Sequence, residues 1–153
     1  MEITRRTDYA IRLIAELLQH KGVPYSVREA AEAQDVPYAF ARSIQHDLVQ
    51  QGVIKTIRGA KGGMVLDVDP EKFTLYQLIE SVQGPVSVAV CSNDEGWCPK
   101  SKNCKFHKVW EGANLIIKDY LTSVSIKELI NGDLAHITSS FSAADMACLA
   151  KAQ

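Results

Sequence analysis

The sequence lacks long apolar runs, cofactor-binding signatures and catalytic arrangements. Its longest largely apolar run, residues 85–91, is far too short to span a bilayer, and charged residues follow Met1 where a secretory signal would not carry them. It shows no flavin-, nicotinamide- or phosphate-binding signature, no paired carboxylates and no Ser-His-Asp arrangement. These absences predict a cytoplasmic protein that is not an enzyme and has no membrane partner.

Cysteine and net charge are also scarce. The chain has four cysteines and a formal net charge of -1. Its length of 153 residues suffices for one domain or a small domain with an appendage. In a reducing compartment, a few clustered cysteines indicate metal ligands or reactive thiols more strongly than they indicate disulfides. The near-neutral total provides no overall basic field that would indicate a nucleic-acid partner.

The distribution of charge changes that interpretation. Residues 42–63 contain four basic side chains and one acidic side chain, Asp47, which gives this segment a local charge of +3. The basic residues are Arg42, Lys55, Arg58 and Lys61. A second basic group, within residues 100–108, contains four lysines and no acid. For both groups, an ordinary solvated surface is the alternative to a binding role.

Apolar residues at helical spacing predict a helix-turn-helix in the first third of the chain. A first helix runs from residue 5 or 6 to about residue 20, and Gly22 and Pro24 end it. Ser26 and Glu29 form a capping-box pattern that starts a second helix, which ends near residue 34. Pro37 suits the first position of a third helix that ends near residue 51. Two short helices joined by a tight turn are typical of a helix-turn-helix.

Strand patterns predict a β-hairpin wing after these helices. Segments 53–58 and 64–68 flank the turn 59–63, whose glycines can take positive φ and bring backbone close to a ligand. Further helices are expected from Thr74 to residue 83, over 106–121, and over 126–130 between the cap Ser125 and Gly132. The fold is therefore expected to be mainly α with a small β-hairpin wing. Its parts are a winged helix-turn-helix DNA-binding domain (1–84), a cysteine-rich loop (85–105), a long-helix region (106–131) and a tail (132–153) with a weak helical stretch and no assigned role.

A winged helix-turn-helix explains the local basic charge. The third helix can contact base edges in the major groove near its N-terminus, while the wing places Arg58 and Lys61 in the adjacent minor groove. The predicted reading face of the helix consists of Tyr38, Ala39, Arg42 and Ser43. Winged helices also serve as protein–protein modules, and Tyr38 could instead belong to the core.

Three cysteines and a histidine form the second candidate site. Cys91, Cys98 and Cys104 are separated by six and five residues, and His107 follows three positions later. These gaps are too wide for the paired-cysteine knuckle of structural zinc, although three thiolates and an imidazole are chemically able to hold zinc. Iron–sulfur clusters also need thiolates, and imidazole can replace some of them. Cys148, far along the chain, is predicted to be a small buried apolar residue.

The sequence resembles the Rrf-two (Rrf2) family of bacterial transcription regulators, which includes IscR-like, NsrR-like and RirA-like iron–sulfur sensors. The resemblance covers about residues 1–131 and rests on residues 7–12 (TDYAIR), residues 57–63 (IRGAKGG) and the three cysteines. It implies a homodimer that binds double-stranded operator DNA. In such a dimer the long helix, the dimerisation helix, crosses its partner, and the cluster-binding loop lies near the other subunit's DNA-binding domain.

The resemblance also suggests roles for single residues. The three cysteines match the ligands of a cluster, 2Fe–2S or 4Fe–4S, and Arg58 matches a wing arginine that enters the minor groove. Arg42 stands where IscR-like members carry an acidic residue, so the preferred DNA sequence is open. His107 resembles the IscR-like histidine ligand, while Asp8 matches the NsrR-like aspartate that reaches the partner's cluster. Spacing favours His107, and Asp8 could simply be a helix-start acid.

We therefore expect a DNA-binding transcriptional regulator, a repressor or a dual regulator, whose iron–sulfur cluster responds to iron or cluster supply, nitric oxide or redox state. A structural-zinc or metal-independent winged-helix regulator is the first alternative. A small electron carrier or redox enzyme is the second, and the missing cofactor signatures disfavour it.

Overall fold

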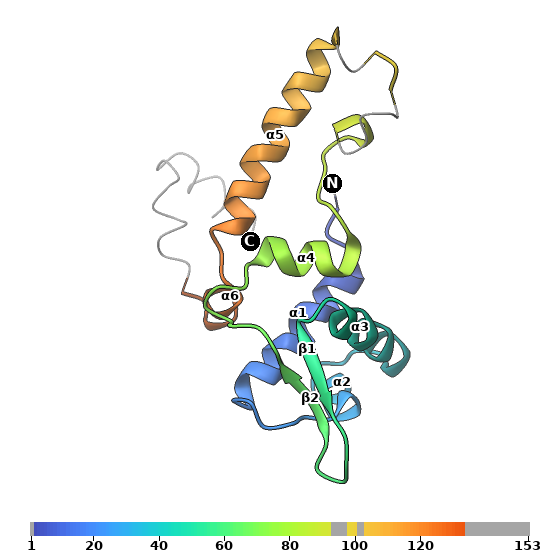
Figure 1. The fold of residues 1–153 in the computed structure, drawn as a ribbon, viewed down its shortest axis with the longest axis vertical. Coiled ribbons are helices and arrows are strands. Elements are labelled where there is room, and N and C mark those ends of the chain that lie inside the picture. The colour runs from blue at the N-terminus through green and yellow to red at the C-terminus, as the bar shows by residue number, and fades with distance from the viewer. Residues whose placement is uncertain (1, 93–97, 101–102, 134–153) are drawn as a thin grey trace.

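The structure is a computed structural model that describes residues 2–92, 98–100 and 103–133 (Figure 1). It confirms the predicted fold, which is mainly helical with one antiparallel hairpin. The elements are, in chain order, α1 (Arg5–Gln19), α2 (Val27–Ala33), α3 (Tyr38–Gln50), β1 (Ile54–Ile57), β2 (Gly63–Leu66), α4 (Leu75–Gln83), the short 3-10 helix η1 (Val90–Ser92), α5 (Lys105–Thr122) and α6 (Ile126–Asn131). The expected tail helix over 143–150 and Cys148 lie outside the described residues.

The helix starts follow the predicted caps, with two corrections. Thr74 and Ser125 begin α4 and α6 with reciprocal capping boxes to Gln77 and Glu128. Ser26 caps α2, but its hydroxyl accepts from the Arg28 amide two residues on, so the predicted box with Glu29 is wrong. Pro37 is the N-cap of α3 and not its first helical residue, because its ψ of 128° is still extended.

One apolar core joins the first four helices, the hairpin and the start of α6. Its largest fully buried members include Leu13 and Ile14 of α1, Ile44 and Leu48 of α3, and Leu78 of α4. Each such side chain contributes about 1.5–3 kcal/mol when it is removed from water. This core holds α3 and the hairpin in a fixed relation to α1.

The hairpin is shorter than expected and has a third contributor. Its register pairs Ile54 with Leu66 and Ile57 with Gly63. Tyr25, from the segment before α2, adds an antiparallel bridge to Met64, with backbone N–O distances of 3.0 and 2.8 Å. The wing is therefore fastened at its base to the chain that links α1 and α2.

The long helix α5 extends away from this core, with the segment after α4 beside it (Figure 1). None of its residues is buried. The chain returns to the domain at α6, where Thr74 and Ser125 form a β-bridge. Within the described residues, no helix combines the length and apolar character needed to cross a membrane.

Candidate DNA-binding surface and cysteine loop

The N-terminal half of α3 presents all four predicted reading residues to solvent. Its core face carries Ala41, Ile44 and Leu48, and side chains at other angles around the helix must point outward. Tyr38, Ala39, Arg42 and Ser43 are accordingly exposed. Tyr38 has 43% of its surface exposed, so the interpretation of this residue as part of the core is wrong.

Two contacts organise the start of α3. The Arg42 guanidinium donates to Gln45 Oε1 at 2.9 Å, which anchors the arginine along its own helix. The Arg28 guanidinium, from α2, lies over the Tyr38 ring with 4.6 Å between Cζ and the ring centroid. Sequence reasoning did not single out Arg28, because only the tertiary fold brings α2 against this end of α3.

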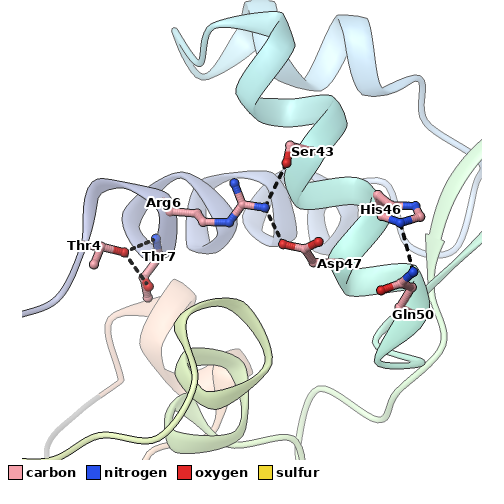
Figure 2. A network of polar contacts seen from close by, with 7 residues as sticks. All are labelled: Thr4, Arg6, Thr7, Ser43, His46, Asp47 and Gln50. Carbon is pink, nitrogen blue, oxygen red and sulfur yellow. Dashed lines mark hydrogen bonds and ion pairs between the residues drawn. The ribbon is translucent and has the colours of Figure 1, made fainter. Parts of the chain in front are cut away.

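Arg6 connects α1 to the middle of α3 (Figure 2). Its Nη2 donates to Ser43 Oγ at 3.0 Å and forms an ion pair with Asp47. Ser43, predicted to read bases, therefore lies at the junction of the two helices. Asp47, the one acid of the basic segment, is paired with an arginine from outside it.

The exposed face of α3 continues one turn beyond the predicted residues. His46 and Gln50 follow Ser43 at helical spacing, and both are exposed. Gln50 Nε2 and His46 Nε2 lie 2.9 Å apart (Figure 2). Sequence reasoning missed both residues, although their three- and seven-residue spacing from Ser43 was a usable signal.

Arg58 and Lys61 are exposed in the hairpin turn, as expected for a wing. Lys55 pairs with Asp67 at 2.6 Å, which leaves Arg58 and Lys61 as the cations nearest the tip. Gly59 takes a positive φ of 117°. A Cβ on Gly62 would lie 2.1 Å from the Ile57 carbonyl oxygen, so the space beside this glycine is filled by the wing's own backbone and not by a ligand.

An aromatic stack supports the base of the wing. The rings of His20 and Tyr25 lie 3.7 Å apart at an angle of 20°, and His20 Nδ1 is 2.8 Å from the Glu16 carbonyl oxygen. Burial, followed by the charges of Glu16 and two further glutamates, raises the pKa of the Tyr25 hydroxyl above its usual value. The phenol therefore stays neutral at physiological pH.

The three cysteines lie in the segment between α4 and α5. Cys91 is in η1, Cys98 is in the loop and Cys104 is the N-cap of α5. All three are free thiols of intermediate burial. Among the described residues, the structure gathers no three His, Cys, Asp or Glu side chains closely enough to hold a metal ion. The cysteines are thus close in the sequence but are not assembled into a finished site.

The two predicted alternatives for a fourth ligand have different surroundings. His107 is mostly buried; its Nε2 lies 3.4 Å from Glu111 Oε1, and its buried Nδ1 has no hydrogen-bond partner in the described part of the chain. A buried ring nitrogen without a partner is unusual in a folded protein. Asp8 lies on α1, half exposed, and pairs with Arg12 at 2.9 Å.

Asn114, on α5, holds the segment that contains Cys91. Its Oδ1 accepts from the Val88 amide at 2.9 Å, and its Nδ2 donates to Ser92 Oγ at 2.9 Å. The Ser87 and Ser92 hydroxyls are 3.0 Å apart, which closes the segment on itself. Sequence reasoning missed this residue; the signal was an asparagine inside a predicted helix, where it needs a special reason.

Known proteins match the chain over most of its length. A family model described as "Rrf2: Iron-dependent Transcriptional regulator" matches residues 3–132. The HTH-type transcriptional regulator NsrR of Shouchella clausii is 28% identical over 132 residues, which covers 85% of this chain and 89% of NsrR. IscR of Photorhabdus laumondii, also an HTH-type transcriptional regulator, is 25% identical over 132 residues and covers 86% of this chain and 80% of IscR. The structure of CymR, the global cysteine regulator of B. subtilis, matches with a TM-score of 0.67 at 23% identity, covering 86% of this chain and 97% of CymR.

Proposed function

The chain belongs to the Rrf2 family of transcriptional regulators, and on that basis we propose that it controls transcription through an iron–sulfur cluster held by Cys91, Cys98 and Cys104. It binds double-stranded operator DNA as a homodimer, and cluster uptake or loss changes its operator affinity. The signal is iron or cluster supply, nitric oxide or redox state. The cluster is of the 2Fe–2S or the 4Fe–4S type.

The donor set fits such a group. Free, half-buried thiols are the ligands that iron–sulfur clusters use most, and imidazole can replace one of them. The structural observation that favours His107 as the fourth ligand is its buried Nδ1, which has no hydrogen-bond partner among the described residues. Asp8 already has a cationic partner in Arg12, so its use by a partner subunit would require that pair to open. When bound, the cluster would supply a redox-active centre that iron limitation or oxidants can destroy.

DNA contact is assigned to α3 and the wing. The exposed outer face of α3 enters the major groove, while Arg58 and Lys61 reach the neighbouring minor groove. His46 and Gln50 extend the same face and join the proposed contacts. The ion pair with Arg6 neutralises Asp47, the one acid of the basic segment, which would otherwise repel DNA phosphates.

Dimerisation is assigned to α5. A helix with a broad apolar stripe and no buried residue needs a partner surface. The exposed apolar residues on this helix are Phe106, Val109, Trp110, Leu115, Ile116 and Tyr120. We propose that a second copy covers them, since a twofold dimer also supplies the two DNA-binding domains that a palindromic operator requires.

A signal can alter DNA binding only if it favours one arrangement of the two DNA-binding domains over another. Asn114 ties the Cys91 segment to α5, the proposed dimer helix. Rearrangement of this segment around a cluster would therefore act on the dimer helix directly. This gives the cysteine loop a physical route to the spacing of the two domains.

Anaerobic spectroscopy tests the proposal. We expect protein purified without oxygen, or reconstituted with iron and sulfide, to show the visible absorption and Mössbauer signals of an iron–sulfur cluster. A variant with alanine in place of Cys91, Cys98 and Cys104 should lose these signals and the response of DNA binding to nitric oxide or an iron chelator. Cys148→Ala is the matched control and should keep both. A colourless wild-type protein after reconstitution, with DNA binding unchanged in the triple variant, would refute the proposal.

A second candidate is a regulator of the same family whose cysteines hold structural zinc or no metal. Within this candidate, the observation that favours the metal-independent form is that the described residues hold no gathered group of metal-binding side chains. Metal analysis separates the candidates: one zinc per chain without iron or sulfide supports structural zinc, and neither metal supports the metal-independent form.

A further inference from the structure

Gln83 lies at the junction between the DNA-binding domain and residues 85–92, which contain Cys91 and are called the cysteine segment below. It is the last residue of α4, and Gly84 follows it with a positive φ of 85°. The chain then leads directly through residues 85–89 to η1 and Cys91. Along the backbone, movement of the cysteine segment therefore reaches the core domain at Gln83.

The side chain of Gln83 fastens the start of α1 to the end of α4. Its Oε1 accepts from the Thr4 amide at 3.1 Å, from Thr4 Oγ1 at 3.2 Å and from Thr7 Oγ1 at 2.5 Å. Its Nε2 donates to the Glu2 carbonyl oxygen at 3.2 Å. Thr7 is fully buried, so its hydroxyl has no access to water as a substitute acceptor. One side chain thus holds a helix start that is more than 70 residues away in the sequence.

The same turn of α1 holds α3 through Arg6. Arg6 lies between Thr4 and Thr7 in the sequence, and its guanidinium contacts Ser43 and Asp47 (Figure 2). The cysteine segment is therefore connected to Gln83 by backbone, Gln83 is bonded to the first turn of α1, and Arg6 in that turn contacts α3. Each step is a direct hydrogen bond, an ion pair or a continuous piece of backbone.

We propose that Gln83 is the positioning residue that transmits the state of the cysteine segment to α3. Gln83 has no role as a DNA or metal ligand in this proposal. It sets the orientation of α1's first turn, and Arg6 then sets how α3 meets the groove. The part of the proposal that concerns transmission rests on the proposed function, whereas the positioning of α3 does not require a cluster.

Operator affinity tests the positioning role. The probe is a DNA duplex selected from a randomised library by the full-length wild-type protein purified without oxygen. Replacing Gln83→Ala should weaken binding by about 2- to 30-fold, the range expected for a residue that acts through contiguous contacts. Gln83→Glu should retain most of the affinity, because a carboxylate oxygen still accepts from Thr4 and Thr7. Gln19→Ala, which changes the exposed last residue of α1, is the matched control and should bind as wild type does.

A double-mutant cycle separates transmission from general destabilisation. If Gln83 acts through Arg6, the loss in Gln83→Ala combined with Arg6→Ala should be smaller than the product of the two single losses. A purely structural role gives a loss equal to that product. That result, or wild-type affinity in Gln83→Ala, would overturn the proposal. Thermal melting establishes that each variant is folded at the assay temperature.

The cluster-dependent step has its own measurement. In the wild type, the ratio of operator affinities with and without the cluster measures the coupling. In Gln83→Ala this ratio should fall toward one while the visible spectrum of the loaded protein stays unchanged. An unchanged ratio would overturn the transmission role. If the wild type takes up no cluster, the proposed function fails, and the double-mutant cycle alone decides the positioning role.

Discussion

Arg58 and Lys61 lie in the same exposed turn, yet the two side chains have different chemistry. The guanidinium is a planar fork that suits a narrow groove or a base edge, whereas the ammonium is a strongly hydrated point charge suited to phosphate. Lys55, the third cation of the wing, is already paired with Asp67. At the residue scale, we therefore expect sequence preference from Arg58 and general DNA affinity from Lys61.

Arg58→Ala should weaken the free energy of binding to the selected duplex by about 1–3 kcal/mol, because the loss of a groove contact affects the preferred DNA sequence most. Lys61→Ala should weaken all duplexes alike and reduce the slope of log affinity against log salt by about 0.9. Fluorescence anisotropy on selected and scrambled duplexes at several salt concentrations measures both. Lys72→Ala, a highly exposed lysine outside the wing, is the control. Equal losses on both duplexes in Arg58→Ala would contradict a reading role.

The fourth ligand is the second question at the residue scale. His107→Ala should shift the visible spectrum of the loaded protein and speed cluster loss in air, because a buried imidazole would be removed from the cluster. Asp8→Ala should instead leave the spectrum unchanged and only remove the pair with Arg12. Absorption and Mössbauer spectra of both variants decide between them. A spectral change in Asp8→Ala alone would transfer the assignment to the partner's α1.

At the scale of elements, the wing depends on Gly62 and Gly63. The sequence indicated that glycines in this turn bring backbone close to a ligand, but the structure shows that these two are needed for packing within the protein. A Cβ on Gly62 would lie 2.1 Å from the Ile57 carbonyl oxygen, and one on Gly63 would lie 2.6 Å from the Tyr25 backbone. Both contacts are with backbone, which cannot move aside without breaking the hairpin or its bridge. The glycines are thus required by the internal packing of the wing.

Gly63→Ala should therefore destabilise the protein by about 1–3 kcal/mol, the usual cost of forcing extra volume into a packed site. Thermal unfolding followed by circular dichroism measures the loss. Ala60→Ser, in the exposed tip, is the control and should stay within about 0.5 kcal/mol of wild type. An unchanged melting temperature in Gly63→Ala would mean that β2 and the Tyr25 segment separate freely.

At the scale of the whole molecule, the apolar face of α5 is the feature that a single chain leaves unsatisfied. Ile116 is 73% exposed and Phe106 is 74% exposed, although both are large apolar residues. Helix α5 extends away from the core domain, and none of its residues is buried within the single chain (Figure 1). The molecule is therefore expected to be complete only as a pair.

Ile116→Glu should convert the dimer to monomers, because two carboxylates would be brought into an apolar interface without partners. Sedimentation velocity measures the change in mass. Operator affinity should fall with it, since a monomer binds only one half-site. Thr122→Glu, at the exposed last residue of the same helix, is the control. A wild-type sedimentation profile for Ile116→Glu would place the dimer contact elsewhere or refute it.

Local patterns predicted much of the fold from the sequence. Helical periodicity, the caps Thr74 and Ser125 and the glycine-rich turn all act between neighbours, so the elements were placed to within a few residues. The contacts of Arg6 and Gln83 were not predictable in this way. Those features depend on residues that are 37 to 81 positions apart in the sequence.

The sequence by itself determined the winged helix-turn-helix elements, the basic charge of residues 42–63 and the spacing of the three cysteines, because each is a property of neighbouring residues. Only the tertiary structure decided which side chains meet. It paired Asp47 with Arg6, joined the wing to Tyr25 and attached the Cys91 segment to α5 through Asn114. The physical reason is that packing of the apolar core sets the distances between helices, and polar partners are then selected by proximity.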